Sequence, residues 1–390
     1  MTSTQVVVTG IGLLTALGQN ASANWQKLTA GESAIALRQP FLDLPPMPLA
    51  MEGKHPLPLN EILQSVVSEA WTDAAIGTDF KAKDCGVVIG SSRSYLREWE
   101  AMAIRQRVRK FQGKSEGEFK GDWLAALPHG PALMAARIIG ATGPVLAPMA
   151  ACATGVWAIA QAANLIRNGQ CQRVIAGAVE SPITPLTLAG FSKMGALATT
   201  GCYPFDQARE GFVLGEGGAV VVLESASFAR QRGADTYGEV LAAGMTNDSH
   251  HVSSFEPTYR MGKRAVVLCL ERSGLTPDAI DAVHTHGTST VQNDRMEAAL
   301  IEQILDSQIP VMATKGAIGH TLGASGAVNV ALSLMSLKRQ QVLPCVGLNN
   351  PDFELNFVNG LAVKKSLEHV LCSSFGFGGQ NAVLALRRTF

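Results

Sequence analysis

The chain has 390 residues, of which 47% are apolar and only 16% are charged. An average soluble domain has about 25% charged residues, so most of this chain must be buried, and disorder and fibrous structure are excluded. Its 32 Lys and Arg residues balance 32 Asp and Glu residues, which leaves no overall basic field for nucleic acid or an anionic membrane.

The N-terminal segment has none of the features of a secretory signal peptide. MTSTQVVVTGIG lacks a basic start, a long apolar stretch and a small-residue cleavage site. Residues 138–166 carry no charge, but prolines and polar residues interrupt them, so we expect a buried strand–turn–helix there rather than a membrane span. We therefore expect a cytoplasmic protein without membrane insertion.

Short β-branched runs bounded by glycine alternate with helical stretches along the chain. This alternation is typical of an α/β protein. The predicted elements are strands at 6–9, 86–89, 238–243 and 280–284, and helices at 60–75 and 260–273.

The segment 91–135 is the least regular part of the chain. It is polar and carries a basic cluster, so we expect it to lie outside the core. The cluster is typical of a solvated helix face, and the alternative is a docking patch for an acidic partner. It consists of Arg105, Arg107, Arg109, Lys110 and Lys114.

An internal repeat relates the two parts of the chain. Cys152-Ala-Thr-Gly155 precedes an apolar helix to Arg167, and Gly323-Ala-Ser-Gly326 precedes a similar helix to Arg339. Strand candidates follow at 173–177 and 342–346, although Pro344 weakens the second. The sequence therefore predicts two related α/β halves, 1–235 and 236–390, in one compact body.

Seven cysteines are scattered without any C-x-x-C pair, which argues against a disulfide framework and a zinc site. Cys152 lies just before a predicted helix, where N–H groups and the helix dipole favour the thiolate. Its small neighbours leave room for a bulky adduct. The position therefore favours a nucleophile, with a small buried apolar residue as the alternative.

Two histidines and a glycine-rich segment complete the set of candidates. His286 follows a predicted strand, where open α/β sheets place their sites. His320 precedes a helix whose dipole favours a neutral imidazole that donates a hydrogen bond. The segment 373–381 is either a structural turn or a mobile loop that supplies backbone N–H groups to an oxyanion hole.

Several motifs occur together and in order: Ala151-Cys152-Ala-Thr-Gly155, Pro204-Phe-Asp206 with 210–217, His286-Gly-Thr-Ser-Thr290, Lys315 with Gly319-His320, and Gly376-Phe-Gly-Gly379. In these motifs the chain resembles a β-ketoacyl-acyl-carrier-protein synthase of the elongating type, over roughly residues 4–90 and 136–388. The resemblance implies the thiolase fold, two related α/β halves packed as five layers. It also implies decarboxylative condensation of an acyl thioester with a malonyl-carrier protein.

The resemblance implies a role for each catalytic residue. Cys152 would accept the acyl group, and His286 with His320 would handle malonyl decarboxylation. Lys315 and Glu297 would form a supporting ion pair near the histidines.

Further residues and partners follow from the same resemblance. Thr288 and Thr290 would contact the pantetheine arm, with Gly378 beside the substrate, and the backbone N–H of Phe377 would join that of Cys152 in the oxyanion hole. No metal and no organic cofactor is expected. The expected partner is an acyl-carrier protein bearing acyl and malonyl groups, and the expected assembly is a homodimer or a heterodimer.

The chain departs from the family pattern at Val291, Asn293, His284 and Gln380, and 91–135 matches poorly. None of these departures removes a catalytic group, but they leave the choice of acyl substrate open between housekeeping and specialised pathways. Three other activities remain as alternatives: a non-catalytic partner of the chain-length-factor kind, a Cys-His hydrolase, and a thiolase acting on coenzyme A esters with Cys372 as second cysteine.

Overall fold

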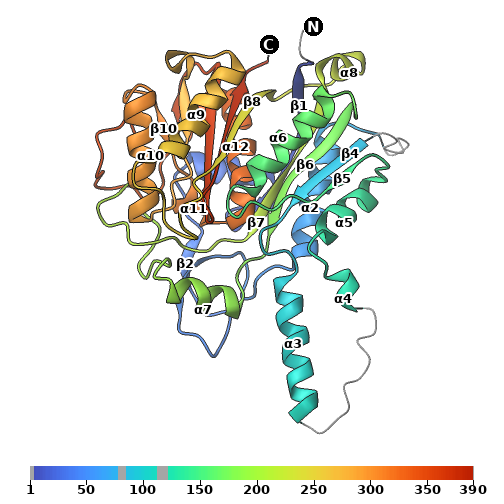
Figure 1. The fold of residues 1–390 in the computed structure, drawn as a ribbon, viewed down its shortest axis with the longest axis vertical. Helices are drawn as coiled ribbons and strands as arrows, with labels where there is room; N and C mark the ends of the chain where they lie inside the picture. Colours follow the sequence, from blue (N-terminus) through green and yellow to red (C-terminus); the bar gives the residue numbers. More distant parts are fainter. Residues whose placement is uncertain (1–3, 78–84, 112–121, 390) are drawn as a thin grey trace.

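The computed structural model describes residues 4–77, 85–111 and 122–389 (Figure 1). Its centre is one ten-stranded sheet with the order β10-β9-β13-β14-β8-β1-β7-β6-β4-β5. The strands are β1 (Val6–Thr15), β4 (Cys85–Gly90), β5 (Val145–Leu146), β6 (Arg173–Glu180), β7 (Gly217–Ser225), β8 (Gly238–Asn247), β9 (Ala282–His284), β10 (Val311–Met312), β13 (His369–Gly376) and β14 (Gln380–Arg387).

The sheet consists of two groups of five strands with the same internal order. The N-terminal group runs β1-β7-β6-β4-β5 and the C-terminal group runs β8-β14-β13-β9-β10. In each group the first two pairings are antiparallel and the last two are parallel, and a short β1–β8 pairing joins the groups. This topology supports the predicted repeat, and we propose that the halves divide just before β8, between residues 235 and 236.

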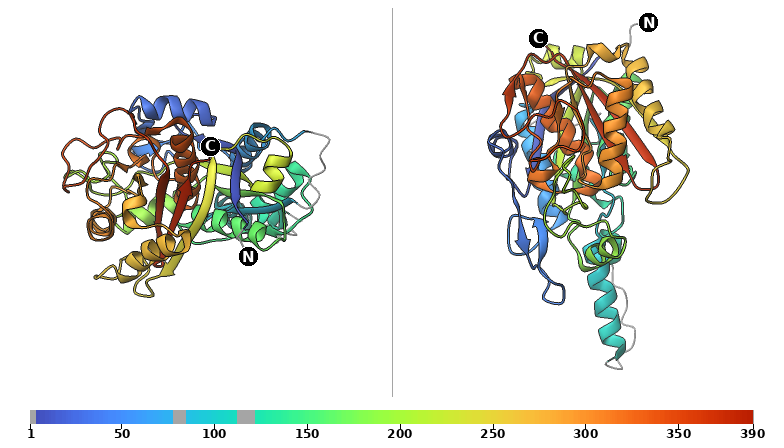
Figure 2. Two further views of the ribbon diagram at one scale, coloured as in Figure 1. Left: turned by 90° about the horizontal axis from the view of Figure 1, so that it is seen from above. Right: turned by 90° about the vertical axis from the view of Figure 1, so that its left-hand side faces the viewer.

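Helices cover both faces of each group and fill the space between the groups (Figures 1 and 2). One outer layer packs on the N-terminal strands, a central pair of helices lies between the strand groups, and the other outer layer packs on the C-terminal strands. The layers are α2 (Leu59–Asp73) with α5 (Gly130–Ile139), α6 (Thr154–Arg167) with α12 (Ser325–Arg339), and α9 (Arg260–Ser273) with α10 (Val291–Ile304). The predicted five-layer thiolase fold is therefore confirmed.

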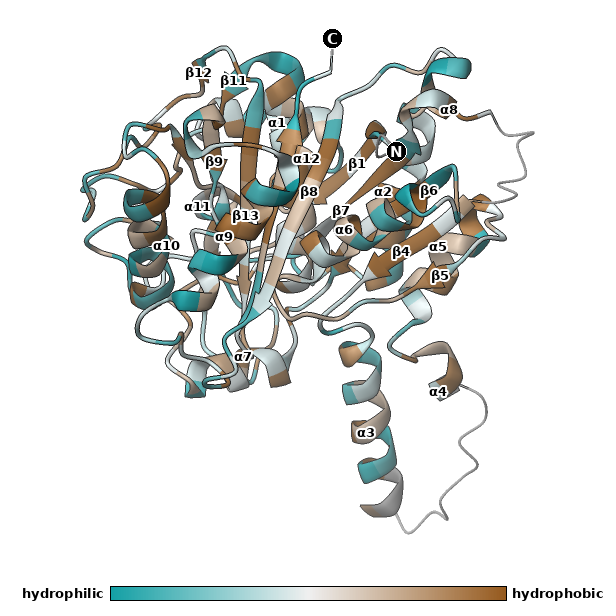
Figure 3. Cartoon of the chain, turned by 45° about the horizontal axis from the view of Figure 1, so that its top comes forward, coloured by the Kyte–Doolittle hydropathy of each residue, from teal (hydrophilic) through white to brown (hydrophobic). Residues whose placement is uncertain are grey.

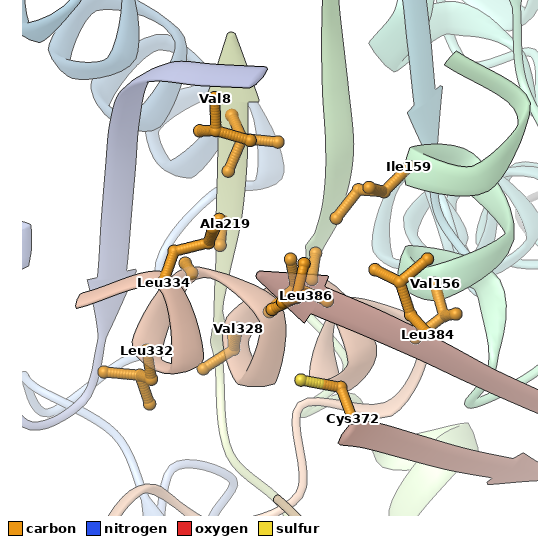
Figure 4. Close-up of a cluster of buried hydrophobic side chains, with 14 of the residues drawn as sticks. Val8, Val156, Ile159, Ala219, Val328, Leu332, Leu334, Cys372, Leu384 and Leu386 are labelled. Atoms are coloured by element: carbon orange, nitrogen blue, oxygen red, sulfur yellow. The ribbon is translucent and has the colours of Figure 1, made fainter. Parts of the chain in front are cut away.

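Helices α6 and α12 make the closest helix contact of the core at the two repeated glycines. A Cβ on Gly155 would lie 2.2 Å from the backbone nitrogen of Ala327, and one on Gly326 would lie 2.9 Å from that of Val156. Around this crossing, apolar side chains from both halves form one continuous cluster (Figure 4). Glycine is required at both positions because no other residue leaves room for the neighbouring backbone.

Most predicted elements are present, with one misplaced strand. All four strands predicted by hydrophobic runs and both predicted helices have counterparts in the structure. The strand predicted at 342–346 is wrong: only β11 (Gln341–Val342) forms, and it pairs with β12 (Val363–Lys364) in a separate small sheet. Pro344 has no N–H to continue a ladder, and β13 instead occupies the place that β6 has in the first half.

The expectation for 91–135 was also partly wrong, because this segment contains α3 (Leu96–Phe111), α4 (Asp122–Ala125) and the start of α5. Helix α3 projects away from the body (Figures 1 and 3), whereas Ala132 and Ala135 on α5 are fully buried in the N-terminal core. Because apolar and charged residues are mixed along α3, its sequence did not show the pattern expected of a helix. In the basic cluster Arg105 and Arg107 are exposed on α3, and Lys114 lies outside the described residues.

The remaining elements are short. Among the helices that the structure describes, none has both the length and the apolar character needed to cross a bilayer. These elements are α1 (Ala21–Thr29), β2 (Ile35–Arg38), β3 (Met47–Ala50), α7 (Pro185–Lys193), α8 (Ala226–Gln231), α11 (Lys315–Ile318) and short 3-10 helices at Pro277–Ala279 and Leu322–Ala324.

Candidate active site

The predicted nucleophile and both predicted histidines lie together at the junction of the two halves. Cys152 lies in the turn between β5 and α6, His286 follows β9, and His320 lies between α11 and α12. The Cys152 sulfur and one ring nitrogen of each histidine lie within 4.8 Å of one another. All three residues are buried, so one small, dry site contains a thiol and two imidazoles.

The turn that carries Cys152 is strained and fixed by hydrogen bonds. Ala151 has φ +47°, a left-handed conformation that residues other than glycine adopt infrequently. The Thr154 hydroxyl donates to the Ala151 carbonyl (2.7 Å) and accepts from the Ala150 N–H (2.8 Å). The Ser374 hydroxyl, on β13, donates to the Cys152 carbonyl (2.9 Å), so groups from both halves hold the cysteine in place.

The surroundings of Cys152 favour the thiol in the resting site, whereas the sequence predicted a thiolate. Cys152 lies one residue before the N-cap of α6, which is Ala153. Burial raises the pKa of the Cys152 thiol to about 11, although the Lys315 charge and the backbone N–H of Phe377 lower it. Desolvation is therefore the largest influence on this thiol, and the Lys315 charge, the Phe377 N–H and the Arg93 charge favour the thiolate.

Both histidines are neutral hydrogen-bond donors toward the site. Burial, followed by the Lys315 charge, lowers the pKa of His286 and of His320 well below the usual value. The Lys315 ammonium lies 3.4 Å from His286 Nδ1, and since an ammonium only donates, the ring proton lies on Nε2. The Ser325 hydroxyl lies 2.8 Å from His320 Nδ1, so a proton on Nε2 of His320 leaves Nδ1 to accept from this hydroxyl.

Glu297 holds the backbone at His286 rather than forming the predicted contact with Lys315. Its carboxylate accepts from the N–H groups of His286 (2.7 Å) and Gly287 (2.6 Å) and from the Ser373 hydroxyl (2.6 Å). Lys315 instead donates to the His286 carbonyl. Among the described residues the Lys315–Glu297 pair is not within salt-bridge distance, although Glu297 raises the pKa of Lys315, which burial lowers to about 8.

The residues predicted to bind the substrate lie in the segments that carry His286 and Phe377. The hydroxyls of Thr288 and Thr290 are 2.8 Å apart, and Thr290 caps α10. Phe377 is half-buried in the loop between β13 and β14, with its ring 6.1 Å from that of Phe191. Gly378 is exposed at φ +78° and donates its N–H to the Val252 carbonyl (2.8 Å).

The sequence analysis missed several residues that complete the site. Ser325 contacts a catalytic candidate directly, and its place in Gly323-Ala-Ser-Gly326 was a usable signal. Phe191 and Phe212 form an aromatic wall, with the Phe212 ring 5.1 Å from both Phe191 and His320. These aromatic residues carry no local signal because α7 and the segment before β7 come together only in the folded chain.

Two departures from the family pattern lie in the supporting structure. The Asn293 amide donates to Glu297 (2.8 Å). The His284 ring lies 3.0 Å from the Ser333 hydroxyl and 3.2 Å from that of Thr314, and burial lowers the pKa of His284 to about 3. Both residues therefore support the segments that carry His286 and Lys315.

The other cysteines and a bound metal were tested against the same geometry. The Cys372 thiol donates to the Ser333 hydroxyl (3.0 Å), and burial raises its pKa to about 12, so it is not placed as a second catalytic thiol.

One cysteine and two histidines are ligand types that Zn²⁺ accepts. However, the Lys315 charge acts on the same three side chains and opposes a cation, so we assign no metal there.

Comparison with known proteins agrees with the site. Residues 57–229 match the family described as Beta-ketoacyl synthase, N-terminal domain, and residues 237–349 match Beta-ketoacyl synthase, C-terminal domain. The chain is 32% identical to a 3-oxoacyl-[acyl-carrier-protein] synthase 2 of Synechocystis sp., with 98% of each chain covered.

Two solved structures share the fold over almost the whole chain. One is described as a type II PKS acyl-carrier protein in complex with its ketosynthase bound to the hexaketide (TM-score 0.92, 24% identity, covering 99% of this chain and 100% of that one). The other is a ketosynthase in complex with its chain length factor from Xenorhabdus doucetiae (TM-score 0.83, 25% identity, covering 99% and 98%). With both family domains matched in order and a full-length relative above 30% identity, this chain belongs to the β-ketoacyl synthase family and is a carbon–carbon bond-forming acyltransferase.

Proposed function

We propose that Cys152, His286 and His320 carry out a decarboxylative condensation between an acyl group held on Cys152 and malonyl-acyl-carrier protein. The observation that carries this proposal is the grouping of the thiol and two ring nitrogens within 4.8 Å. A thiol that holds an acyl chain and two neutral donors that face it are the groups that this reaction requires.

The first step is transfer of the acyl group. The Cys152 sulfur bonds to the acyl carbonyl carbon, the bond to the carrier's pantetheine sulfur breaks, and the thiol proton passes to the leaving sulfur. The N–H groups of Cys152 and Phe377 stabilise the oxyanion. The Phe377 N–H lowers the pKa of the Cys152 thiol, which supports this placement.

The second step is decarboxylation and bond formation. The malonyl C–CO₂ bond breaks, and its electron pair forms an enolate whose oxygen accepts from the Nε2–H groups of His286 and His320. The enolate carbon then bonds to the acyl carbonyl, the bond to Cys152 breaks, and a proton from solvent restores the thiol. Two neutral imidazoles suit this step because both stay uncharged donors at neutral pH.

Two kinds of partner follow from this proposal. Exposed Arg105 and Arg107 on α3 are suited to an acidic carrier protein through salt-sensitive attraction. The same arm exposes Ile104 and Val108, and the edge strand β5 exposes Leu146, as expected of a surface that a second subunit covers. We therefore propose a homodimer, with a heterodimer as the alternative, in the cytoplasm.

Intact mass spectrometry tests the proposed function. The enzyme is exposed to carrier proteins loaded with different acyl chains and then to malonyl-carrier protein. We expect an acyl adduct on Cys152 that disappears with release of a β-ketoacyl product. Release of the free acid would instead show a Cys-His hydrolase, and absence of any adduct would show a non-catalytic partner.

A further inference from the structure

Arg93 lies beside the acyl-accepting cysteine and has no role in the mechanism proposed above. It follows β4 in the turn 91–94, and its guanidinium carbon lies over the Phe191 ring, 5.0 Å from the centroid. Phe191 belongs to the same buried cluster as Cys152, with Phe377 packed against it. The cation is therefore at the aromatic wall of the acyl site.

The turn that carries Arg93 is held rigidly. Buried Glu180 accepts from the hydroxyls of Ser91 (3.1 Å) and Ser92 (2.6 Å) and from the backbone N–H of Arg93 (3.3 Å). Ser94, with φ +47°, donates its N–H to the Ser91 hydroxyl (2.7 Å). The backbone that carries the Arg93 side chain is therefore fixed with respect to Cys152.

The charge of Arg93 acts on the reacting sulfur. It is one of three groups that lower the pKa of Cys152, after Lys315 and the Phe377 N–H. A charge whose field reaches the thiol is also positioned to act on an acyl chain attached to that thiol.

The guanidinium N–H groups lack a protein acceptor in the part of the chain that the structure describes. In contrast, Arg97 on the next turn donates to the Pro56 carbonyl (3.0 Å), and the carboxylate of Glu180 is occupied by the turn itself. The Arg93 side chain is half-buried, so water can reach its donors. A hydrocarbon chain that displaced this water would leave charged donors unpaired, which is unfavourable.

We propose that Arg93 binds an oxygen acceptor on the acyl chain carried by Cys152, so that the enzyme prefers an oxygenated acyl group to a plain hydrocarbon of equal length. This inference rests on the proposed role of Cys152 as acyl acceptor. A carboxylate fits best because the planar guanidinium binds it with two parallel hydrogen bonds. A hydroxyl or ketone oxygen accepts one bond and binds less strongly.

The test compares three carrier-bound acyl chains of one length: saturated, ending in a hydroxyl, and ending in a carboxylate. Competing pairs are offered to the enzyme, and the adducts on Cys152 are counted by intact mass spectrometry. We expect the wild-type enzyme to favour the carboxylate-ended chain over the saturated chain by about tenfold to a hundredfold, the range for a charged hydrogen bond. The hydroxyl-ended chain should fall between them.

Variants assign this preference to the guanidinium. Arg93→Leu should favour the saturated chain, Arg93→Lys should keep part of the preference for carboxylate, and Arg97→Leu should behave as wild type. Circular dichroism confirms that each variant is folded. Equal use of the chains by the wild-type enzyme, or a preference that survives in Arg93→Leu, would overturn the inference while leaving the proposed function intact. No adduct with any chain would overturn both.

Discussion

The entrances of helices α6 and α12 occupy equivalent places in the two halves but hold different chemistry. Before α6 stands Cys152, and the matching position before α12 is Gly323, where a Cβ would lie 2.5 Å from Glu180 Oε1. The hydroxyl of Thr154 braces the strained turn at Ala151, whereas the equivalent Ser325 contacts the ring of His320. One repeated scaffold thus supplies the proposed nucleophile from one half and a proposed enolate donor from the other.

In the proposed mechanism the two halves contribute to different steps, and they also depend on each other sterically. Gly323 has no side chain because the turn held by Glu180, an N-terminal element, fills that space. Lys315 in turn belongs to the C-terminal half but lowers the pKa of Cys152. Variants in each half should therefore affect different steps.

The largest expected effect is on decarboxylation in the C-terminal half. His286→Ala and His320→Ala each remove one donor to the enolate oxygen in a dry site, so CO₂ release from malonyl-carrier protein should fall about a hundredfold to a thousandfold. The acyl adduct on Cys152 should still form, because Lys315 rather than a histidine favours the thiolate. Loss of acylation with intact decarboxylation in His286→Ala would show that His286 is the base that deprotonates Cys152. It would contradict the proposed division of steps between the two halves.

The next effect concerns the helix crossing that joins the halves. Gly155→Ala places a methyl group 2.2 Å from the backbone of Ala327, so the free energy of unfolding should fall by about 3 kcal/mol, at the upper end for overpacking. Urea denaturation followed by circular dichroism measures it. Gly190→Ala is the matched control, because no atom lies within 4 Å of its added Cβ, and a similar loss there would contradict the role of the crossing.

A smaller effect is expected on the reactivity of Cys152 when Lys315→Met removes the ammonium that lowers its pKa. In the wild-type enzyme Cys152, at 9% exposure, should react with iodoacetamide before the other six cysteines, which are at most 3% exposed. Its alkylation rate should rise with pH toward a pKa of about 11. The variant should react about tenfold more slowly near neutral pH, the effect of one pKa unit.

The sign of the pH dependence separates this explanation from a general loss of structure. Burial lowers the pKa of Lys315 to about 8, so wild-type Lys315 loses its charge as the pH rises through 8. The difference between wild type and Lys315→Met should therefore shrink above that pH. Peptide mapping across the pH range measures it, and a difference that grows with pH would contradict the assignment.

The smallest effects are expected from the two equivalent hydroxyls. Ser325→Ala removes the partner of His320 Nδ1 and should slow decarboxylation by about fivefold, as for one neutral hydrogen bond of about 1 kcal/mol. Thr154→Ala loosens the turn at Ala151 and should slow acylation by a similar factor. If both variants affected the same step equally, the two hydroxyls would not serve separate halves of the reaction.

The sequence was sufficient for the parts that depend on local pattern. Hydrophobic runs predicted β1, β4, β6, β8 and β9 but not β7, β13 or β14. The Gly155 and Gly326 motifs predicted the repeat, and position in the chain made Cys152 and His286 candidates that the family motifs then singled out. The sequence was insufficient where the structure depends on contacts between distant segments. The position of β13 in the sheet, for example, depends on the 26 residues that separate it from β11. The high pKa of Cys152 follows from its burial. The contact of Glu297 with the backbone of His286 depends on how the segment after β9 packs against α10.

Carbon dioxide release by Cys152→Ala shows whether decarboxylation depends on the thiol. If the histidine donors of the C-terminal half carry decarboxylation without the thiol, the variant should form no acyl adduct yet still release CO₂ from malonyl-carrier protein. The double variant Cys152→Ala/His286→Ala, as control, should release far less. A folded Cys152→Ala protein whose CO₂ release fell to the level of the double variant would show that the thiol takes part in decarboxylation and would contradict the division between the two halves.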